Sequence, residues 1–151
     1  MAQAPAYVLD TNVLIHYARA SIAGKAIEAK YQFQATAFKP FVCIVTVGEV
    51  LAFAQYRKWG DQRVKELKKL LENVVRLNID APEILQAYAD LHTHCVTNGF
   101  KLSDNDLWIA ATTQVTGACL ITTDRDFDCL FPILIRRVFV DPKTGQIEDK
   151  P

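Results

Sequence analysis

The sequence predicts an α/β fold in which helices cover both faces of a parallel sheet, a doubly wound α/β sandwich. Two patterns support this prediction. Short, uninterrupted apolar runs, typical of strands buried on both faces, alternate with longer segments whose apolar residues recur at helical spacing. The chain has 151 residues, of which 50% are hydrophobic, so one core of ordinary size accounts for the whole length. We therefore expect a single domain over residues 1–151.

The expected strands are apolar runs rich in β-branched residues and bounded by polar or turn-forming residues. The first run stops abruptly at Asp10, and the last is followed by the turn pair Asp141-Pro142. The predicted strands are Ala6–Leu9, Phe41–Val45, Val74–Ile79, Ala118–Thr122 and a strand within Ile133–Val140. Ligands collect at the carboxyl ends of parallel strands, so the residues that follow these runs are where a site is expected.

The expected helices follow the strands and carry apolar residues at a period near 3.6. The third of them is amphipathic, with a basic outer surface. Pro82 suits a first helical turn, and Gly99 and Gly117 suit helix ends. The predicted helices are Thr11–Ala18, Thr46 to about Trp59, Asp61–Asn73, Pro82–Asn98 and Asp104–Thr116. The long stretch from Ser21 to Pro40 is left without a predicted element.

Charge and composition restrict the class of function. Lysine plus arginine and aspartate plus glutamate number 17 each, so a nucleic-acid-binding module that works by overall charge is disfavoured, and any nucleic-acid contact must be local. The N-terminus has no secretory pattern, and no apolar run approaches the roughly 20 residues of a membrane span. The four cysteines lack a CxxC pair, which favours reduced thiols. We expect a soluble, cytoplasmic protein.

Three acidic residues are predicted to meet at one edge of the sheet. Asp10 closes the first strand, Glu49 lies one helical turn beyond the second, and Asp124 stands two residues beyond the Ala118–Thr122 strand. A fourth acid, Asp106, opens the helix that leads back into that strand. If this helix runs antiparallel to the strands, its start need not lie at the carboxyl edge. Sequence geometry alone therefore does not place Asp106 beside the other three.

Each acid taken alone also fits a structural role. Glu49 and Asp106 each stand three residues after a threonine or serine, the spacing of a capping box, and Asp10 or Asp124 could cap the segment that follows it. The joint pattern favours a functional site. Carboxylates that converge repel by about 3 kcal/mol per pair at about 5 Å with an effective dielectric constant near 20, so an empty cluster stabilises the fold poorly.

A divalent cation reverses the sign of this repulsion. Oxygen ligands, together with the lack of suitable histidine or cysteine ligands, favour Mg²⁺ or Mn²⁺ over zinc. Such ions suit phosphodiester hydrolysis because they deprotonate a water and neutralise charge that builds up on the phosphate. No serine or cysteine stands beside a plausible base, so a covalent nucleophile is not indicated.

Four segments of the chain resemble the acidic motifs of PIN-domain nucleases, in the same order and over nearly the whole length. They are Tyr7–Asn12 (YVLDTN), Val45–Val50 (VTVGEV), Asp106–Ala111 (DLWIAA) and Ile121–Phe127 (ITTDRDF). The compact size resembles the VapC toxins of toxin–antitoxin pairs in particular. The resemblance implies a three-layer α/β/α sandwich with a central parallel sheet, Mg²⁺- or Mn²⁺-dependent RNA cleavage, a homodimer, and inhibition by an antitoxin whose tail occupies the acidic groove.

The resemblance also assigns roles to the acids. It brings Asp106 into the pocket, with Asp10 and Asp106 as direct ligands of the metal and Glu49 and Asp124 completing the cluster directly or through water. Asp104 is the competing candidate for the position of Asp106. Because the motif is matched only from Asp106 onward, we interpret Asp104 as a helix-start residue.

Further residues are assigned supporting roles. Asp126 is a candidate fifth acid, and Asn12 and Thr123 are expected to orient carboxylates or water, although both also fit ordinary turn chemistry. Trp59 and Trp108 are expected in the core or at an interface. Basic residues of the second and third predicted helices could guide an RNA backbone, although a solvated helix face also explains them. These residues are Arg57, Lys58, Arg63, Lys65, Lys68 and Lys69.

Four other functions share part of this pattern. A housekeeping PIN nuclease would have the same site but no antitoxin gene beside it, and a PIN scaffold would bind RNA without cutting it. A receiver-like signalling domain would need paired acids early in the chain and a lysine after a late strand. A haloacid-dehalogenase phosphatase would show DxD where this chain has Asp10, Thr11 and Asn12.

Overall fold

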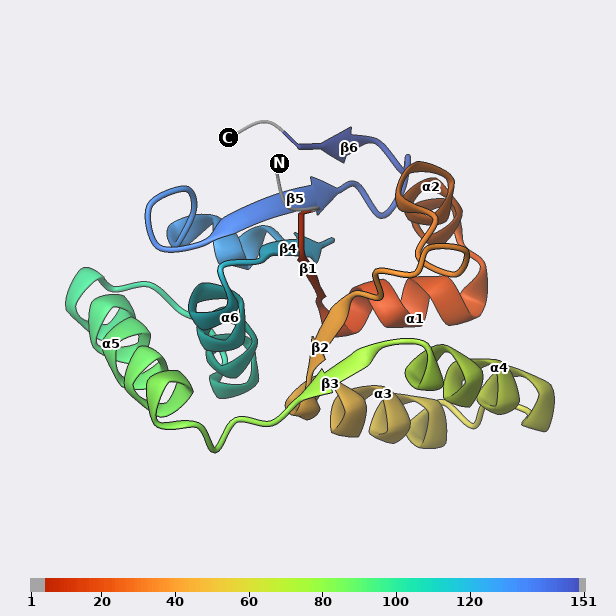
Figure 1. The fold of residues 1–151 in the computed structure, drawn as a ribbon, viewed down its shortest axis with the longest axis horizontal. Coiled ribbons are helices and arrows are strands. Elements are labelled where there is room, and N and C mark those ends of the chain that lie inside the picture. Colours follow the sequence, from red (N-terminus) through yellow and green to blue (C-terminus); the bar gives the residue numbers. More distant parts are fainter. Residues whose placement is uncertain (1–4, 150–151) are drawn as a thin grey trace.

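Within residues 5–149, strands from the five predicted apolar runs and one further strand form a six-stranded sheet in the order β3-β2-β1-β4-β5-β6 (Figure 1). The structure, a computed structural model, describes residues 5–149. The first five strands in this order are parallel, and β6 pairs antiparallel with β5. The strands are β1 (Tyr7–Leu9), β2 (Phe41–Cys43), β3 (Val75–Leu77), β4 (Cys119–Thr122), β5 (Arg136–Val140) and β6 (Ile147–Glu148). The predicted parallel sheet is confirmed, with one antiparallel edge strand added.

In the described part of the chain six α-helices connect the strands, and five of them correspond to predicted helices. The helices are α1 (Thr11–Arg19), α2 (Ile22–Tyr31), α3 (Ile44–Tyr56), α4 (Asp61–Glu72), α5 (Pro82–Asn98) and α6 (Asp104–Thr116), and a short 3-10 helix, η1 (Arg125–Cys129), follows β4. Gly99 and Gly117 end α5 and α6 with positive φ angles of 72° and 66°, as their positions predicted.

The helix α2 lies in the stretch that the sequence left unassigned. Ser21 caps it, because the Gly24 N–H donates to Ser21 Oγ at 3.2 Å. Ala23 and Ile27 are buried and Tyr31 packs against the same core, so the apolar spacing of one helical face was present in the sequence.

The predicted end of the Phe41–Val45 strand was wrong. The strand stops at Cys43, and Ile44 and Val45 are the first residues of α3. Apolar residues at a strand-to-helix junction pack against the core in either conformation, so the hydrophobic pattern does not mark the boundary. The last long strand also begins later than its run, at Arg136, because the preceding residues form turns.

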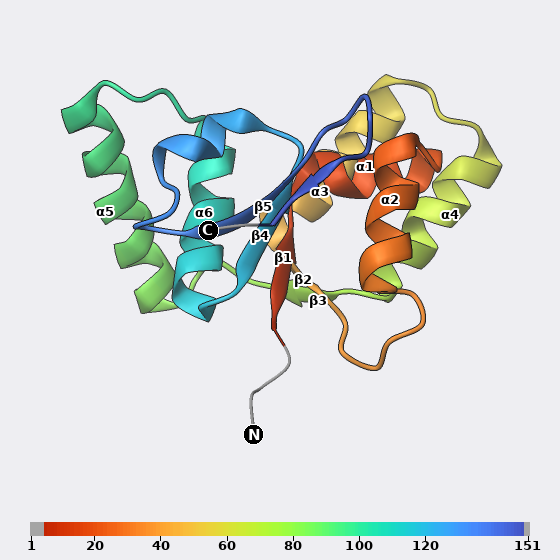
Figure 2. The same ribbon diagram turned by 90° about the horizontal axis from the view of Figure 1, so that it is seen from above.

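Alternate residues of the central strands face two separate cores, which makes the fold three-layered. Leu9 and Ile121 pack with residues of α1 to α4, whereas Val8 and Leu120 pack with residues of α5 and α6. Figure 2 shows α5 and α6 on one side of the sheet and α1, α2 and α4 on the other. The predicted α/β/α sandwich is therefore confirmed. Because β1 to β5 are parallel, all five end at the same edge of the sheet, its carboxyl edge.

No helix within residues 5–149 has the length and apolarity that crossing a membrane requires.

All four cysteines are free thiols, and Cys43 and Cys95 are buried. Burial raises the pKa of both thiols.

Two glycines offer a matched test of the packing between α1 and α2. A Cβ at Gly24 would lie 2.4 Å from the backbone carbonyl oxygen of His16, whereas a Cβ at Gly48 would have no atom within 4 Å. We predict that Gly24→Ala lowers the free energy of unfolding by about 1 to 3 kcal/mol, because the backbones of α1 and α2 must separate. Gly48→Ala should raise it by roughly 0.5 to 1 kcal/mol through helix propensity. Urea denaturation of both variants measures the difference, and equal effects would contradict this packing.

Candidate active site

The four predicted acids lie at the carboxyl edge of the sheet. Asp10 directly follows β1, Asp124 follows β4 by two residues, and Glu49 lies in the second turn of α3, which begins where β2 ends. The three strands are neighbours in the sheet, with β1 between β2 and β4. The parallel topology thus delivers these side chains to one place from segments far apart in the chain.

Asp106 reaches the same edge because of the direction of α6. This helix returns the chain to the beginning of β4, so it runs against the strands and its own start lies at their carboxyl ends. The expectation that an antiparallel helix need not start at this edge was wrong, since an antiparallel crossover helix starts there. Asp106 is the second acid of the first turn of α6, and its charge acts on Asp10.

Asp10 is the most enclosed of the acids, with 3% of its surface exposed. Its Oδ1 accepts a hydrogen bond from the Thr11 N–H at 2.8 Å, and its Oδ2 accepts one from Thr122 Oγ1 at 2.7 Å. Burial raises the pKa of Asp10 to about 7, the two hydrogen bonds lower it, and the negative charges of Asp106 and Asp124 raise it further. The two hydrogen bonds hold the Asp10 carboxyl group in place, but they do not offset the cost of burying its negative charge.

Asp106 is half-buried and shares this environment. Burial raises its pKa to about 6, hydrogen bonding with the Ser103 side chain opposes the shift, and the charges of Asp124, Glu49 and Asp126 add to it. Ser103 caps α6 by accepting from the Asp106 N–H at 3.1 Å, so the serine, not the aspartate, does the capping. The Asp106 carboxyl group therefore interacts both with Ser103 and, through their charges, with the other acids.

Asp104 is directed elsewhere. Its Oδ1 accepts a hydrogen bond of 3.0 Å from the Tyr88 hydroxyl of α5. Asp104 thus contacts α5, whereas the charge of Asp106 acts on Asp10.

Glu49 is held by two side chains that the sequence did not single out. Thr11 Oγ1 donates to Glu49 Oε1 at 2.7 Å, and Asn105 Nδ2 donates to Glu49 Oε2 at 3.1 Å. Thr11 Oγ1 also lies 3.2 Å from Thr46 Oγ1. The capping-box interpretation of Thr46 and Glu49 does not hold, because α3 starts at Ile44 with Cys43 as its N-cap.

Asp124 is tied to Asp10 through Thr122. The Thr122 hydroxyl donates to Asp10 and accepts from the Asp124 N–H at 3.0 Å. Asp124 Oδ1 in turn accepts from the Asp126 N–H at 2.8 Å, which caps η1. Asp124 thus has the predicted capping contact and also belongs to the cluster, because its charge acts on both Asp10 and Asp106.

The supporting residues proposed from the sequence are placed as follows. Asn12 is exposed and Thr123 is half-buried, and neither side chain makes a hydrogen bond with another described residue. Of the two adjacent threonines, Thr122 is the one whose hydroxyl contacts an acid, Asp10. Asp126 is exposed, and its charge acts on Asp106, which places it at the rim of the cluster.

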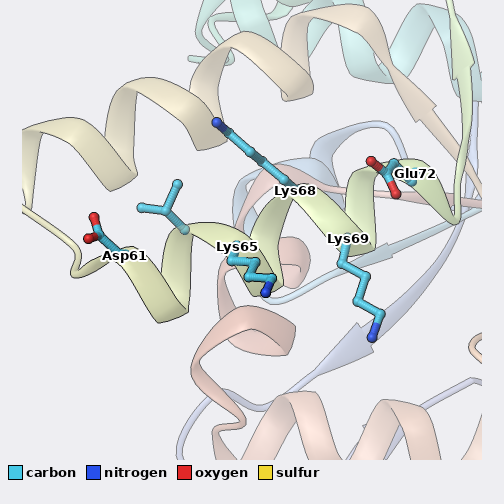
Figure 3. A pocket seen from close by; sticks show the side chains of 6 residues that line it. Asp61, Lys65, Lys68, Lys69 and Glu72 are labelled. Atoms are coloured by element: carbon cyan, nitrogen blue, oxygen red, sulfur yellow. The ribbon is translucent and has the colours of Figure 1, made fainter.

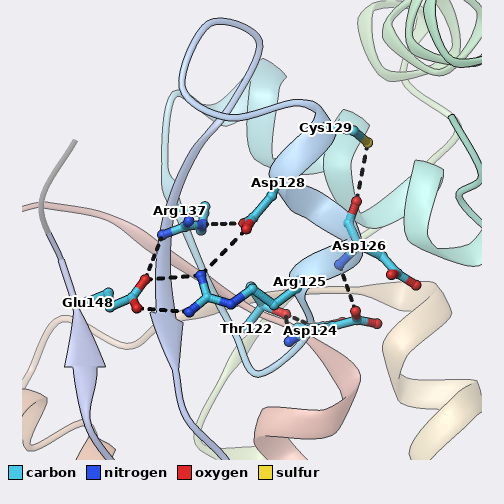
Figure 4. A network of polar contacts seen from close by, with 9 residues as sticks. Thr122, Asp124, Arg125, Asp126, Asp128, Cys129, Arg137 and Glu148 are labelled. Carbon is cyan, nitrogen blue, oxygen red and sulfur yellow. Dashed lines mark hydrogen bonds and ion pairs between the residues drawn. The ribbon is translucent and has the colours of Figure 1, made fainter. Parts of the chain in front are cut away.

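Arg125, the basic residue next to Asp124 in the sequence, is paired with an acid outside the cluster. Arg125 stands between Asp124 and Asp126 in the sequence, yet its guanidinium donates to both carboxylate oxygens of Glu148 in β6, at 2.8 and 3.1 Å. Figure 4 shows this guanidinium on the side of the chain opposite to the carboxylates of Asp124 and Asp126. Within residues 5–149, Asp10, Glu49, Asp106 and Asp124 form no ion pair with lysine or arginine.

The donor set fits a hard divalent cation in its chemistry. All the donors are carboxylate oxygens, two of the acids have raised pKa values, and no lysine or arginine of residues 5–149 forms an ion pair with them. As the side chains lie within residues 5–149, no group of three or more His, Cys, Asp or Glu residues is placed to hold a metal ion. The acids share one edge of the sheet and act on one another through their charges.

Comparison with known proteins identifies the family. The PIN domain family model matches residues 7–130, which include all four acids and the elements that carry them. The chain therefore belongs to the PIN domain family. PIN domains are generally nucleases, and these nucleases generally use divalent metal ions. No curated protein matches the chain.

Solved structures with a similar fold come from toxin–antitoxin systems. VapBC from Salmonella typhimurium, in a DNA-bound structure, has a TM-score of 0.73 at 16% identity, covering 89% of this chain and 97% of that chain. VapBC2 from Rickettsia felis, bound to a promoter fragment, has a TM-score of 0.70 at 17% identity, covering 87% and 97%. VapBC-5 from Mycobacterium tuberculosis has a TM-score of 0.64 at 24% identity, covering 91% and 100%. At these identities the likeness concerns the fold.

The raised pKa of Asp10 predicts a pH-dependent stability in EDTA. A carboxyl group whose pKa is higher in the folded state stabilises the fold below its unfolded pKa, near 4, and this stabilisation is lost as the pH rises toward about 7. The free energy of unfolding of the wild type should therefore fall by a few kcal/mol between about pH 5 and pH 8, relative to that of Asp10→Asn. Urea denaturation of the wild type and Asp10→Asn across this pH range measures the difference in their free energies of unfolding.

The exposed Asp90 of α5 supplies the control for this experiment. Asp90→Asn should follow the wild-type pH profile, because Asp90 lies outside the cluster. If the difference in the free energy of unfolding between the wild type and Asp10→Asn does not change with pH, the charged form of Asp10 does not destabilise the fold.

Proposed function

We propose that this PIN-domain protein is a Mg²⁺- or Mn²⁺-dependent endoribonuclease and the toxin component of a VapBC-type toxin–antitoxin pair. The observation that carries the proposal is the cluster of Asp10, Glu49, Asp106 and Asp124, which come from four separate segments and, among residues 5–149, form no ion pair with a basic side chain. A fold that gathers uncompensated carboxylates in this way is poorly explained by stability alone. It is well explained by the binding of a cation.

In this proposal Asp10 and Asp106 hold the cation directly, and Glu49 and Asp124 complete the site directly or through water. Asp126 is available at the rim. The cation supplies an activated water and neutralises negative charge on the phosphate during hydrolysis. The reaction is hydrolysis of an RNA phosphodiester, in which the oxygen of water forms the new bond to phosphorus and a ribose oxygen leaves.

The chain itself positions the ligands. Thr122 and the Thr11 N–H fix both oxygens of Asp10, and Thr11 and Asn105 fix both oxygens of Glu49. Because these hydrogen bonds restrain both carboxylates, fewer side-chain conformations would be lost when a cation binds. Because burial keeps part of the Asp10 population protonated near neutral pH, cation binding is expected to displace a proton.

The toxin assignment is supported by the similarity of the fold to VapBC structures over most of both chains. By this analogy we propose a cytoplasmic homodimer that is inhibited by a small antitoxin. The housekeeping alternative, an RNA-processing PIN nuclease, shares the same chemistry and differs only in having no antitoxin.

The chemical part of the proposal predicts cleavage of RNA that requires Mg²⁺ or Mn²⁺ and stops in EDTA. Asp10→Asn and Asp106→Asn should each lower the cleavage rate by about 100-fold or more, because each removes a charge that acts on the reacting centre. Asp104→Asn is the matched control, since Asp104 is bonded to Tyr88. Its rate should stay within a few-fold of the wild type in a gel assay with labelled RNA.

Two results would contradict this part of the proposal. Full activity in EDTA would exclude the metal mechanism. Loss of activity in Asp104→Asn, with none in Asp106→Asn, would move the catalytic role to the other aspartate.

The biological part predicts growth inhibition that depends on the acids. Inducing the wild type in bacterial cells should arrest growth and create new RNA ends, and inducing Asp10→Asn should do neither. A small protein encoded beside the gene should copurify with the chain and suppress cleavage in vitro. Cleavage without growth arrest, and without an adjacent inhibitor, would favour the RNA-processing alternative.

A further inference from the structure

Three arginines gather over two aromatic rings on the outer helices. The Arg19 guanidinium, at the end of α1, lies 5.1 Å from the centre of the Phe53 ring and 5.8 Å from that of Trp59. Arg57 lies 5.5 Å from the Phe53 ring, and Arg63 lies 5.4 Å from the Trp59 ring. The two rings meet edge to face at 5.8 Å. We call these five residues the arginine–aromatic cluster.

The arginines of this cluster are exposed and uncompensated. Across residues 5–149, the side chains of Arg19, Arg57 and Arg63 form no ion pair with an acid. Stacking on a ring holds a guanidinium in place, while its N–H groups remain directed to solvent. In a chain with no net charge, three such groups make a local cationic site that is already ordered.

The cluster lies at a defined distance from the acids. Both α1 and α3 begin at the acidic edge of the sheet, and in Figure 1 both run outward from it in the same direction. Arg19 lies eight positions after Thr11, and Arg57 lies eight positions after Glu49, which corresponds to about 12 Å along a helix. Since the Arg19 guanidinium contacts Phe53 of α3, the two helix ends are adjacent. The cluster is therefore a few nucleotides away from the acids.

We propose that the arginine–aromatic cluster anchors the phosphate backbone of a single-stranded RNA substrate on the side of the scissile bond that lies over α1 and α3. This inference rests on the proposed ribonuclease function. The acidic site by itself repels a polyanion, so affinity must come from a cationic surface elsewhere. The planar N–H fork of arginine matches phosphate oxygens in a bidentate manner. The substrate is thus an RNA long enough to reach both sites.

The lysines of α4 are less suited to this role. Lys65, Lys68 and Lys69 line a shallow depression of about 590 Å³ together with Asp61 and Glu72, which offset part of their charge. Figure 3 shows the three lysine side chains pointing in different directions from the helix.

The arginine–aromatic cluster contains Arg19, which was not predicted from the sequence, and lacks Lys58, which was. Lys58, named from the sequence with Arg57 and Arg63, is exposed, and its ammonium group does not lie over any ring of the described residues. Arg19, which the sequence did not single out, takes its place.

Binding of a labelled single-stranded RNA of about 12 nucleotides, followed by anisotropy in EDTA, tests the anchor without cleavage. The slope of log affinity against log salt should fall by about 0.7 for each phosphate that is no longer neutralised, hence by about 2 in the triple variant Arg19→Gln/Arg57→Gln/Arg63→Gln. Replacing the same arginines by lysine should retain most of the slope. Lys143→Gln removes one exposed charge outside the cluster and should leave binding unchanged. Circular dichroism melting verifies that each variant is folded.

Steady-state cleavage separates anchoring from catalysis. In the triple glutamine variant, KM for the long RNA should rise by about tenfold or more while kcat stays near the wild-type value. Cleavage of a trinucleotide, too short to reach the cluster, should be the same in both proteins.

The failures of the two proposals are distinguishable. If the wild type cleaves RNA and the triple variant has the same KM and the same salt slope, the anchor is refuted and the proposed function stands. If RNA binding depends on the arginines but no metal-dependent cleavage occurs, the nuclease proposal fails and the anchor stands. Variants that lose an acidic protein partner while binding RNA normally would assign the cluster to that partner and overturn the proposal.

Discussion

Burial of carboxyl groups beside one another at the carboxyl edge of the sheet is the constraint on which the rest of the structure depends. Asp10 is 3% exposed and is held by two hydrogen bonds while the charges of Asp106 and Asp124 act on it. Carboxylates about 5 Å apart repel by about 3 kcal/mol at an effective dielectric constant near 20. Within residues 5–149 no basic side chain forms an ion pair with Asp10, Asp106 or Asp124. The fold is therefore less stable at this site than it could be, as is common for functional sites.

The architecture accounts for how this arrangement is maintained. The central strand β1 lies between β2 and β4, and Thr122 joins the ends of β1 and β4 by hydrogen bonds to Asp10 and from Asp124. A second contact comes from β6, which lies beyond the residues 7–130 that match the PIN family model. Glu148 of β6 binds Arg125, and this guanidinium also lies 3.7 Å from the centre of the Phe139 ring, so the cation closest in sequence to Asp124 is kept away from the acids.

Much of the fold and the identity of the acids could be predicted from the sequence, because both depend on local patterns. The apolar runs indicated the five parallel strands, and acids that follow strand ends meet wherever such strands are adjacent. The helix α2 and the crossover placement of Asp106 were also predictable and were missed. The partners of the acids were not predictable: Thr11 and Asn105 reach Glu49 from 38 and 56 residues away, and such contacts depend on how helices pack. The same holds for Arg19, which meets Phe53 only through the packing of α1 on α3.

The central claim is that the acidic cluster is destabilised as it stands and is completed by a divalent cation. The most direct measurement is the number of protons released when Mg²⁺ or Mn²⁺ binds, obtained by isothermal titration calorimetry at about pH 6.5, between the two raised pKa values, in buffers of different ionisation enthalpy. With pKa values of about 7 for Asp10 and about 6 for Asp106, the wild type should release about one proton per bound cation, and Asp10→Asn should release much less. Cation binding without proton release, or no binding by the wild type, would contradict the account.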